Sequence, residues 1–232
     1  MAEQLPLQFE HRGHKSFDTY YPGNNQEVID HLKNCIAGAG EQQIFIWGAK
    51  GLGKSHLLQA ASQLAQEQGK TSFYYAFTET ELPGTGILIG LDEYEIVCFD
   101  NIEIIAGNSE WEHSFFNFYN RHRDHGFRLI LSSQCPPNQL PVVLPDLKTR
   151  LNWGLTLKLQ DLSDNDRVNA LAYKARQMGF DISPKIGRFL LKHSTRDLNT
   201  LWELLDRLDH ATLAAKRKLT VPFLKEILNK QK

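Results

Sequence analysis

Short apolar runs alternate with helical patterns along the first two thirds of the chain. Continuous or nearly continuous apolar runs occupy residues 43–47, 72–77, 95–99, 128–132 and 155–159. The apolar spacing of a helix face occupies residues 27–37, 53–66 and 111–123. Strands that are apolar along their length and separated by helices are typical of a parallel sheet covered on both faces. The pattern therefore predicts an α/β fold, a parallel αβα sheet.

The pattern changes after residue 160, where no further strand is predicted. Helix starts are predicted instead, with capping residues or proline, at Ser163, Pro184, Thr195 and Pro222. We therefore expect a flexible tail at 1–15, an αβα domain at 16–160 and a smaller all-helical lid domain at 161–232.

Composition excludes several classes of protein. The 232 residues are 41% hydrophobic and 23% charged, which is ordinary for a globular chain. The net charge of −1 argues against a large sequence-independent DNA footprint. No apolar run approaches the length of a membrane span, no secretory signal is visible, and the three cysteines form no metal or disulfide pattern. We expect a soluble, cytoplasmic protein.

The strongest chemical signal is a glycine-rich run between a predicted strand and a predicted helix. It matches the Walker A pattern G-x4-G-K-S and consists of Gly48, Ala49, Lys50, Gly51, Leu52, Gly53, Lys54 and Ser55. Such a loop surrounds phosphate with backbone N–H groups at a helix N-terminus. Lys54 is expected to bridge the outer phosphates of ADP or ATP, and Ser55 to ligate Mg²⁺. We add the next residue, His56, to the predicted nucleotide-binding set.

A second acidic motif follows on another strand. Asp100 ends the apolar run IVCFD like a Walker B aspartate and is expected to orient Mg²⁺ through water, with Ser55 as the other metal-side residue. The alternative for Asp100 is a plain turn or helix-capping role. Many ATPases carry a catalytic carboxylate at the next position, but here Asn101 accepts no proton at neutral pH. Glu103 is expected to point elsewhere, so we expect weak intrinsic ATP hydrolysis.

The order of these motifs resembles the AAA+ module of the DnaA/Hda family. The matching runs after Walker A are DNIE, LILSSQCPP, LKTRLNWGL and RDL, at 100–103, 129–137, 147–155 and 196–198. Residues 16–25, here called the N-terminal segment, are similar to the family motif F-x-x-[FY]-x-x-G-x-N. The chain ends where DnaA continues into a helix-turn-helix domain, and a short tail replaces the long N-terminal region. That shortened form is similar to the Hda branch, which inactivates DnaA after initiation.

The resemblance implies nucleotide contacts beyond the P-loop. Arg196 matches the sensor-2 arginine, which reaches the phosphates across the domain interface; an ion pair with Asp197 or Asp181 is the alternative. Residues of the N-terminal segment that match the adenine-side motif are Tyr20, Tyr21, Pro22 and Asn24. The alternative for these four is simple packing at a domain edge. Gln134 stands where DnaA has a sensor-1 aspartate, a departure that argues further against hydrolysis.

Arg150 matches the box VII arginine, which in this family reaches into a neighbour's ATP site. A guanidinium at the γ-phosphate stabilises charge that develops during transfer, and such fingers accelerate hydrolysis by ~10³–10⁵-fold. The resemblance therefore implies a catalytic role in trans, in the site of DnaA or of another copy in a homo-oligomer. A structural ion pair with Asp146 is the alternative.

The tail carries a second interaction motif. The run QLPLQF resembles the motif that binds the sliding clamp (β subunit) of DNA polymerase III, through Gln4, Leu5, Leu7 and Phe9. A flexible segment that keeps these apolar side chains in water needs a groove to bury them. The alternative is that the tail packs on its own domain. DNA is then contacted through the clamp or by weak direct contact.

These features together predict a AAA+ regulator that binds nucleotide and the clamp and stimulates ATP hydrolysis by DnaA. The result is conversion of ATP-DnaA to inactive ADP-DnaA, which prevents re-initiation. One alternative is a DNA-acting ATPase or helicase loader that hydrolyses its own ATP, against which Asn101 weighs. Another is a small-molecule P-loop kinase, which leaves the helical second domain and the tail unexplained.

Overall fold

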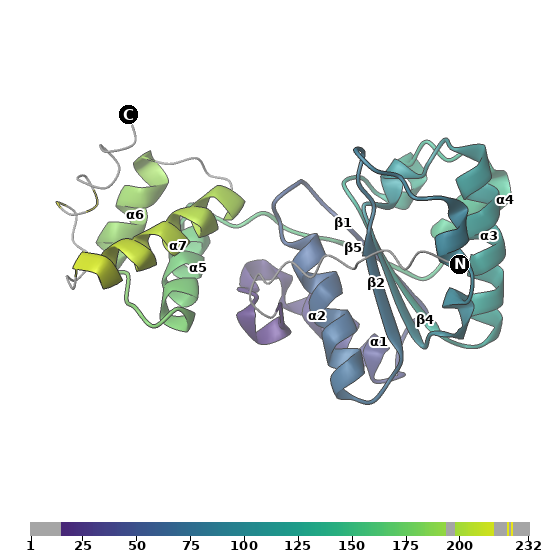
Figure 1. The fold of residues 1–232 in the computed structure, drawn as a ribbon, viewed down its shortest axis with the longest axis horizontal. Coiled ribbons are helices and arrows are strands. Elements are labelled where there is room, and N and C mark those ends of the chain that lie inside the picture. The colour runs from purple at the N-terminus through teal and green to yellow at the C-terminus, as the bar shows by residue number, and fades with distance from the viewer. Residues whose placement is uncertain (1–14, 194–197, 216–221, 223, 225–232) are drawn as a thin grey trace, which may run out of the picture.

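The computed structural model describes residues 15–193, 198–215, 222 and 224 (Figure 1). At its centre lies a five-stranded parallel sheet with strand order β2-β3-β4-β1-β5. The strands are β1 (Gln43–Trp47), β2 (Ser72–Ala76), β3 (Ile96–Asp100), β4 (Arg128–Ser133) and β5 (Leu155–Lys158). Every predicted strand is present, with ends within a residue of the apolar run.

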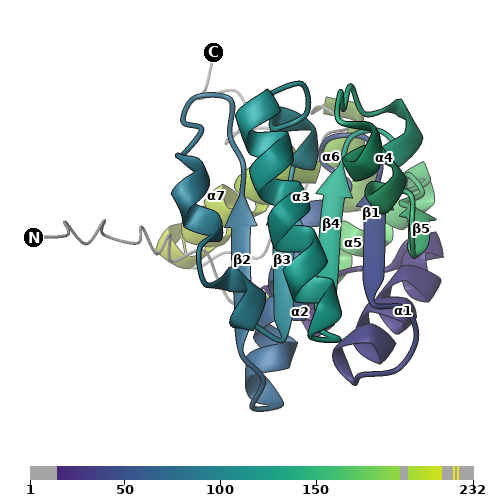
Figure 2. The ribbon, with the colours of Figure 1, turned by 90° about the vertical axis from the view of Figure 1, so that its right-hand side faces the viewer.

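Helices cover both faces of the sheet. The first pair is α1 (Gln26–Ile36) and α2 (Lys54–Glu67), and the second is α3 (Ser109–Asp124) and α4 (Pro145–Leu151). Figure 1 shows the sheet edge-on between the two pairs, and Figure 2 shows α3 and α4 in front of the strands. Along β1, Ile44 and Ile46 join the core beneath α1 and α2, whereas Phe45 joins the core beneath α3 and α4.

The predicted αβα fold is therefore confirmed. Helix α4 overlaps the start of the LKTRLNWGL run at 147–155, for which the sequence indicated no helix. Its seven residues are too few to show a helical period, and Pro145 at its first turn is the local signal that could have marked it.

The remaining helices form a separate helical domain, here called the lid. They are α5 (Asp164–Gln177), α6 (Pro184–His193) and α7 (Leu198–Ala215). Their shared core includes Leu171, Leu190, Leu201, Leu205 and Leu208. The predicted cap at Ser163 is present, because its Oγ accepts a hydrogen bond from the Asp166 N–H at 3.1 Å. The predicted start of α7 at Thr195 lies outside the described residues.

None of the described helices combines the length and the apolarity that a membrane crossing requires.

Candidate nucleotide site

The Walker A run forms the turn between β1 and α2, at the carboxyl end of the sheet. Gly53 has φ 88°, and a Cβ added there would lie 2.6 Å from the ring of Tyr20. Only glycine fits this position, both because of the left-handed backbone and because the tyrosine ring covers it. The loop therefore owes its shape to the glycine spacing and to a side chain from the N-terminal segment.

Lys54 is the centre of this loop. Its side chain is 6% exposed, and its Nζ donates to the Gly48 carbonyl at 2.6 Å and to the Ala49 carbonyl at 2.9 Å. Burial lowers the pKa of Lys54, and the negative charges of Asp100 and Glu103 oppose that shift. The ammonium thus lies inside the loop with two carboxylates near it, and Ser55 follows at half-buried exposure.

Asp100 ends β3 and is fully buried. Its carboxylate accepts hydrogen bonds from the Ser132 hydroxyl and from the Tyr74 hydroxyl, the latter at 3.1 Å. Burial and the charge of Asp100 raise the pKa of Tyr74, so this phenol remains a donor. The two donors fix the orientation of the carboxylate before any ligand is present.

The residues present fit a nucleotide-bound Mg²⁺. Asp100 offers a carboxylate and Ser55 a hydroxyl, and Mg²⁺ is commonly held by one or two such oxygens together with phosphates and water. Within the described residues no group of three or more His, Cys, Asp or Glu side chains could hold a metal ion. This agrees with a metal whose remaining ligands come from the nucleotide and water.

Asn101 and Glu103, the two polar residues that follow Asp100, each have a hydrogen-bond partner in the structure. Asn101 adopts a left-handed backbone, φ 59°, and its Nδ2 donates to the Phe77 carbonyl at 3.1 Å. The amide therefore has a structural contact of its own. Glu103, which was expected to point elsewhere, has its Oε1 accepting the Gln134 N–H at 3.3 Å, and its negative charge also acts on Lys54. Its Oε2 is buried without a hydrogen-bond partner.

The N-terminal segment packs on the P-loop through Tyr20 and His56. The Tyr20 hydroxyl donates to the Leu52 carbonyl at 3.2 Å, and the ring centroids of Tyr20 and His56 are 5.5 Å apart. His56 Nε2 lies 2.9 Å from the Ser16 carbonyl and 3.1 Å from the Thr19 hydroxyl. Burial lowers the pKa of His56 to about 4, so the ring is neutral. In the structure His56 thus anchors the N-terminal segment to α2.

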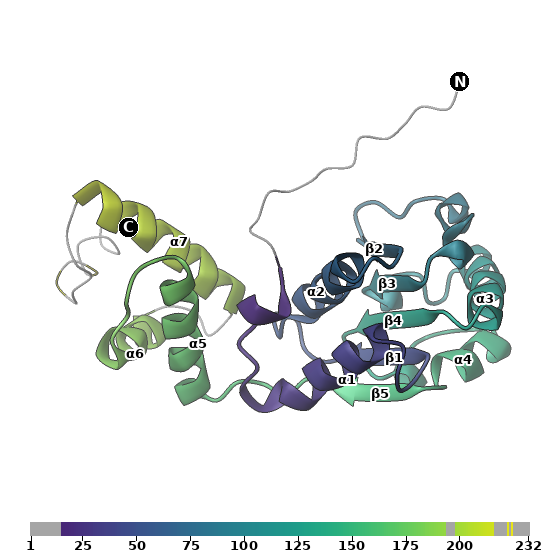
Figure 3. The same ribbon diagram turned by 90° about the horizontal axis from the view of Figure 1, so that it is seen from below.

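The same segment also contacts the lid. The Tyr173 hydroxyl and the Gln177 side-chain amide, both on α5, donate to the Asp18 carbonyl at 2.5 and 2.9 Å. The rings of Tyr21 and Tyr173 meet edge-on, with centroids 6.0 Å apart. Figure 3 shows the segment between the lid and the sheet domain. It is therefore a physical link between the P-loop and the lid.

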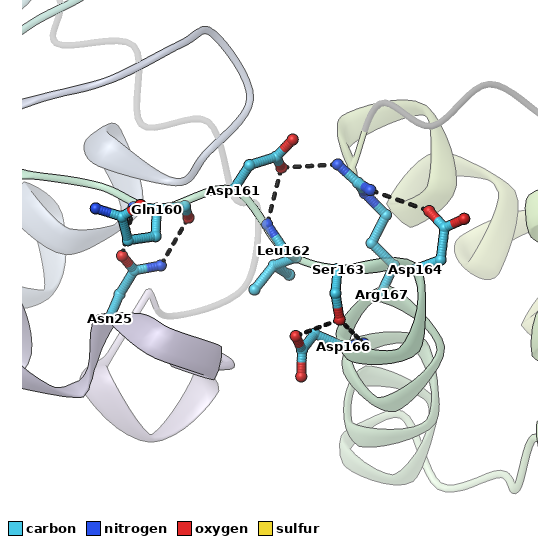
Figure 4. A network of polar contacts seen from close by, with 8 residues as sticks. All are labelled: Asn25, Gln160, Asp161, Leu162, Ser163, Asp164, Asp166 and Arg167. Atoms are coloured by element: carbon cyan, nitrogen blue, oxygen red, sulfur yellow. Dashed lines mark hydrogen bonds and ion pairs between the residues drawn. The ribbon is translucent and has the colours of Figure 1, made fainter.

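The chain crosses to the lid beside Asn25, a residue that the sequence analysis did not select (Figure 4). Asn24, which it did select, is exposed, whereas Asn25 is 2% exposed. Asn25 Nδ2 donates to the Gln160 carbonyl at 3.0 Å, and its Oδ1 accepts the Gln160 N–H at 2.7 Å. Asn25 is the final asparagine of the F-x-x-[FY]-x-x-G-x-N pattern, a signal that could have identified it.

On the lid side of this crossing, Arg167 holds the chain. Its Nη2 donates to Asp161 at 2.7 Å and its Nη1 to Asp164 at 3.2 Å (Figure 4). The side chain of Arg167 is 12% exposed, so these ion pairs are partly shielded from water. The connection between the domains is therefore fixed at both ends by side chains.

Arg150 lies on α4, at the opposite end of the sheet from the P-loop. The Tyr119 hydroxyl donates to the Arg150 carbonyl at 3.4 Å and to Gln43 Oε1 at 2.6 Å. Gln43 is the first residue of β1, and the P-loop follows the last, roughly 13 Å away along the strand. Among the described residues Arg150 forms no ion pair with Asp146; its Cζ lies 4.0 Å from the Trp153 ring centroid instead. This guanidinium faces away from the chain's own nucleotide site.

Two buried side chains that the sequence did not reveal hold α4 in place. Glu112 on α3 accepts the N–H groups of Val143 and Leu144, just before α4, at 3.0 and 2.7 Å. Gln43 donates to the carbonyls of Leu151 and Trp153, just after it, at 3.0 and 2.7 Å. No sequence pattern marks these contacts, because each joins residues far apart in the chain.

Several predicted site residues lie outside the described residues. They are the sensor-2 candidate Arg196 and the clamp-motif residues Gln4, Leu5, Leu7 and Phe9.

Three features define a AAA+ module here. They are a P-loop between β1 and α2, an aspartate at the end of β3, and a helical lid on a sheet of this strand order. The sequence model of the bacterial DnaA ATPase domain matches residues 12–81 and 90–158, more than half of the chain. The chain belongs to that family. The model of the Hda lid domain matches residues 164–228.

Solved structures share this fold at low sequence identity. A replication initiator DnaA bound to AMPPCP and single-stranded DNA is 18% identical, with a TM-score of 0.75 over 88% of this chain and 68% of that one. Domain III of Thermotoga maritima DnaA is also 18% identical, with a TM-score of 0.75 over 90% and 92%. The Thermotoga maritima RuvB Holliday junction branch migration motor is 15% identical, with a TM-score of 0.69 over 93% and 71%.

Proposed function

We propose that this chain regulates replication initiation by stimulating ATP hydrolysis on DnaA, which converts ATP-DnaA to ADP-DnaA and prevents re-initiation. The observation that carries the proposal is the position of Arg150. Its guanidinium lies at the end of the sheet opposite the P-loop and forms no ion pair with any described residue. An arginine so placed serves the site of a neighbouring molecule, and membership of the DnaA family supports DnaA as that molecule.

The chain's own P-loop binds ADP or ATP with Mg²⁺. Lys54 neutralises phosphate charge, Ser55 and Asp100 hold the metal side, and Arg196 contacts the phosphates from the lid. The AMPPCP-bound DnaA with the same fold supports a nucleotide here. Bound Mg²⁺ would neutralise charge on the outer phosphates. Hydrolysis at this site is slow because the Asn101 amide donates to Phe77 and accepts no proton.

In the partner's site the chemistry is ordinary ATP hydrolysis. A water oxygen forms a bond to the γ-phosphorus while the bond to the ADP oxygen breaks, and the products are ADP and phosphate. Arg150 contributes no atom to this reaction. Its planar guanidinium donates two hydrogen bonds to phosphate oxygens whose charge changes in the transition state.

The tail brings the chain to its place of action. Residues Gln4, Leu5, Leu7 and Phe9 dock in an apolar groove of the sliding clamp, and DNA is met through the clamp. Linking one protein to a clamp on DNA raises its effective concentration near DnaA without a new contact between them. The similarity of QLPLQF to the clamp-binding motif supports this step.

The direct test measures ATP hydrolysis by DnaA in the presence of DNA-loaded clamp and each variant at saturating concentration. Arg150→Ala should lower the stimulated rate by ~10³–10⁵-fold, or about 4–7 kcal/mol in the barrier. Arg150→Lys should rescue poorly because it lacks the planar fork. Lys148→Ala, an exposed change on the same helix, is the matched control. Full stimulation by Arg150→Ala would show that Arg150 is not the catalytic arginine, and no stimulation by the wild-type chain would overturn the proposed function.

A second test addresses the tail. Deleting residues 1–9, or changing Leu7 and Phe9 to alanine, should abolish co-elution with the clamp and preserve both the fold and nucleotide binding. Co-elution at wild-type affinity would show that another surface binds the clamp.

One observation favours a second candidate function, ATP turnover by the chain itself. Glu103 places a carboxylate close enough to act on Lys54, with Oε2 buried and unpartnered. If Glu103 orients the attacking water, the isolated chain hydrolyses ATP and Glu103→Gln abolishes that turnover. Negligible ATP turnover by both the wild-type chain and Glu103→Gln would exclude this second candidate function.

A further inference from the structure

Two arginine side chains lie against the ring of one exposed tryptophan. Arg123, near the end of α3, has its Cζ 4.3 Å from the Trp153 ring centroid, and Arg150 has its Cζ 4.0 Å from the same point. Both guanidinium groups therefore lie within contact distance of the same ring. Trp153 is 37% exposed, so the group lies at the surface.

No carboxylate neutralises this pair of charges. Among the described residues neither Arg123 nor Arg150 forms an ion pair, whereas Arg121, on the same helix as Arg123, pairs with Asp92 at 3.0 Å. Burial raises the pKa of Tyr119, and the positive charges of Arg123 and Arg150 both oppose that shift. Both guanidinium charges thus act on the Tyr119 hydroxyl. The electron-rich Trp153 ring offsets the repulsion between the two arginines.

The tryptophan is held as a rigid platform. Gln43 donates to its carbonyl at 2.7 Å, and Gly154 packs so closely on the Gln43 backbone that a Cβ there would clash. A cavity of about 180 Å³ is lined in part by Tyr119, Arg123 and Trp153. The backbone that carries the ring is thus held in place, and Arg123, which also hydrogen-bonds the Tyr119 side chain, lies beside the cavity.

We propose that Arg123 is a second catalytic arginine, which binds the same phosphate chain of the partner's nucleotide as Arg150, and that Trp153 positions both guanidiniums. This inference rests on the proposed function of Arg150. Two like charges held together without a carboxylate suit a polyanion, and a nucleoside triphosphate presents several phosphate oxygens within reach of two guanidinium forks. Arg150 meets the γ-phosphate, and Arg123 neutralises charge that gathers on the leaving diphosphate.

The test titrates the full-length chain into DnaA with DNA-loaded clamp and separates the maximal rate from the half-saturating concentration. Arg123→Ala should lower the maximal rate by about 10²-fold, the effect of losing one strong transition-state donor. Arg123→Lys should restore little of it. Arg121→Ala, which removes an equally exposed charge from the same helix, is the matched control and should retain the wild-type maximum.

The platform role has its own readout. Trp153→Phe keeps an aromatic face and should preserve the maximal rate, whereas Trp153→Leu should lower it although circular dichroism and nucleotide affinity remain unchanged. Equal rates for the two variants would overturn the positioning role.

The failure of this inference is distinguishable from failure of the proposed function. If Arg150→Ala abolishes stimulation and Arg123→Ala keeps the full maximal rate, or changes only the half-saturating concentration, Arg123 is not catalytic and the function of Arg150 stands. If Arg150→Ala itself retains full stimulation, the catalytic role of Arg150 is wrong and the second arginine is wrong with it, whereas absence of stimulation by the wild-type chain would overturn the proposed function itself.

Discussion

Replacing Asn25 with alanine removes both hydrogen bonds that tie the interdomain connection to the sheet domain. Asn25 is 2% exposed, and its amide donates to and accepts from the Gln160 backbone at 3.0 and 2.7 Å. Each such bond contributes about 0.5–1.5 kcal/mol net, and the exposed Gln160 backbone regains water when it is released. We therefore expect a loss of about 1–3 kcal/mol in the free energy of unfolding.

Asn25→Asp makes the prediction sharper. The carboxylate still accepts the Gln160 N–H, but it has no proton for the Gln160 carbonyl and places negative charge against that oxygen. We expect this variant to be less stable than Asn25→Ala, because a buried negative charge held against a carbonyl oxygen costs more than a missing hydrogen bond.

Chemical denaturation at neutral pH measures the stability, and hydrogen exchange at the Gln160 amide reports the local opening. A loss of about 1–3 kcal/mol corresponds to a fall in Tm of about 2–4 °C per kcal/mol for a chain of this size. Asn24→Ala, at the exposed neighbouring position, should stay within about 0.5 kcal/mol of the wild type. The reasoning is refuted if Asn25→Asp is as stable as the wild type, or if the Asn24 and Asn25 variants behave alike.

Three further predictions concern the sheet domain. Gly53→Ala, at φ 88° and with its Cβ 2.6 Å from Tyr20, should cost about 1–3 kcal/mol and weaken ADP binding in calorimetric titration; unchanged affinity would contradict this. Burial lowers the pKa of His122 from 6.5 to about 4, so the unfolded chain takes up the proton first. This contribution to stability is fully present above pH 6.5 and is lost as the pH falls towards 4, and His122→Gln should flatten the slope in urea titrations across that range. Asn101→Asp loses the donor to the Phe77 carbonyl and should destabilise the chain by about 1–3 kcal/mol without faster ATP turnover; a stable variant with raised turnover would show that the amide is not structural.

The strands and the Walker A loop could be predicted from sequence because their signals are local. The central strands β1, β3 and β4 are buried and read as apolar runs, and the edge strands β2 and β5 give shorter-range signals of the same kind; β1 was located to the residue and the other strands to within one. The P-loop needs glycines and a lysine at fixed spacing, and Gly53 has the left-handed backbone that the spacing implies. Helix α4 was missed because a single short helix shows too little periodicity.

Glu103 shows where local reasoning fails. Asn101 adopts a left-handed backbone, and a short 3₁₀ turn, Ile102–Ile104, follows directly. In the structure the Glu103 carboxylate accepts the Gln134 N–H, 31 positions further along the chain. The spacing between Asp100 and Glu103 does not reveal the direction of a side chain, because one unusual backbone angle changes it.

The sequence by itself determined the elements, the phosphate-binding loop and the family, since these depend on periodicities and spacings within a few residues. Only the tertiary structure decided how distant parts of the chain meet. Asn25 binds Gln160 across 135 positions, and Gln43 at the start of β1 fixes Trp153 beneath Arg150. Tyr119 joins the Arg150 carbonyl to Gln43 at the start of β1, whereas the P-loop follows the end of that strand. Such contacts arise from packing and from the satisfaction of buried polar groups, and neither leaves a periodic trace in the sequence.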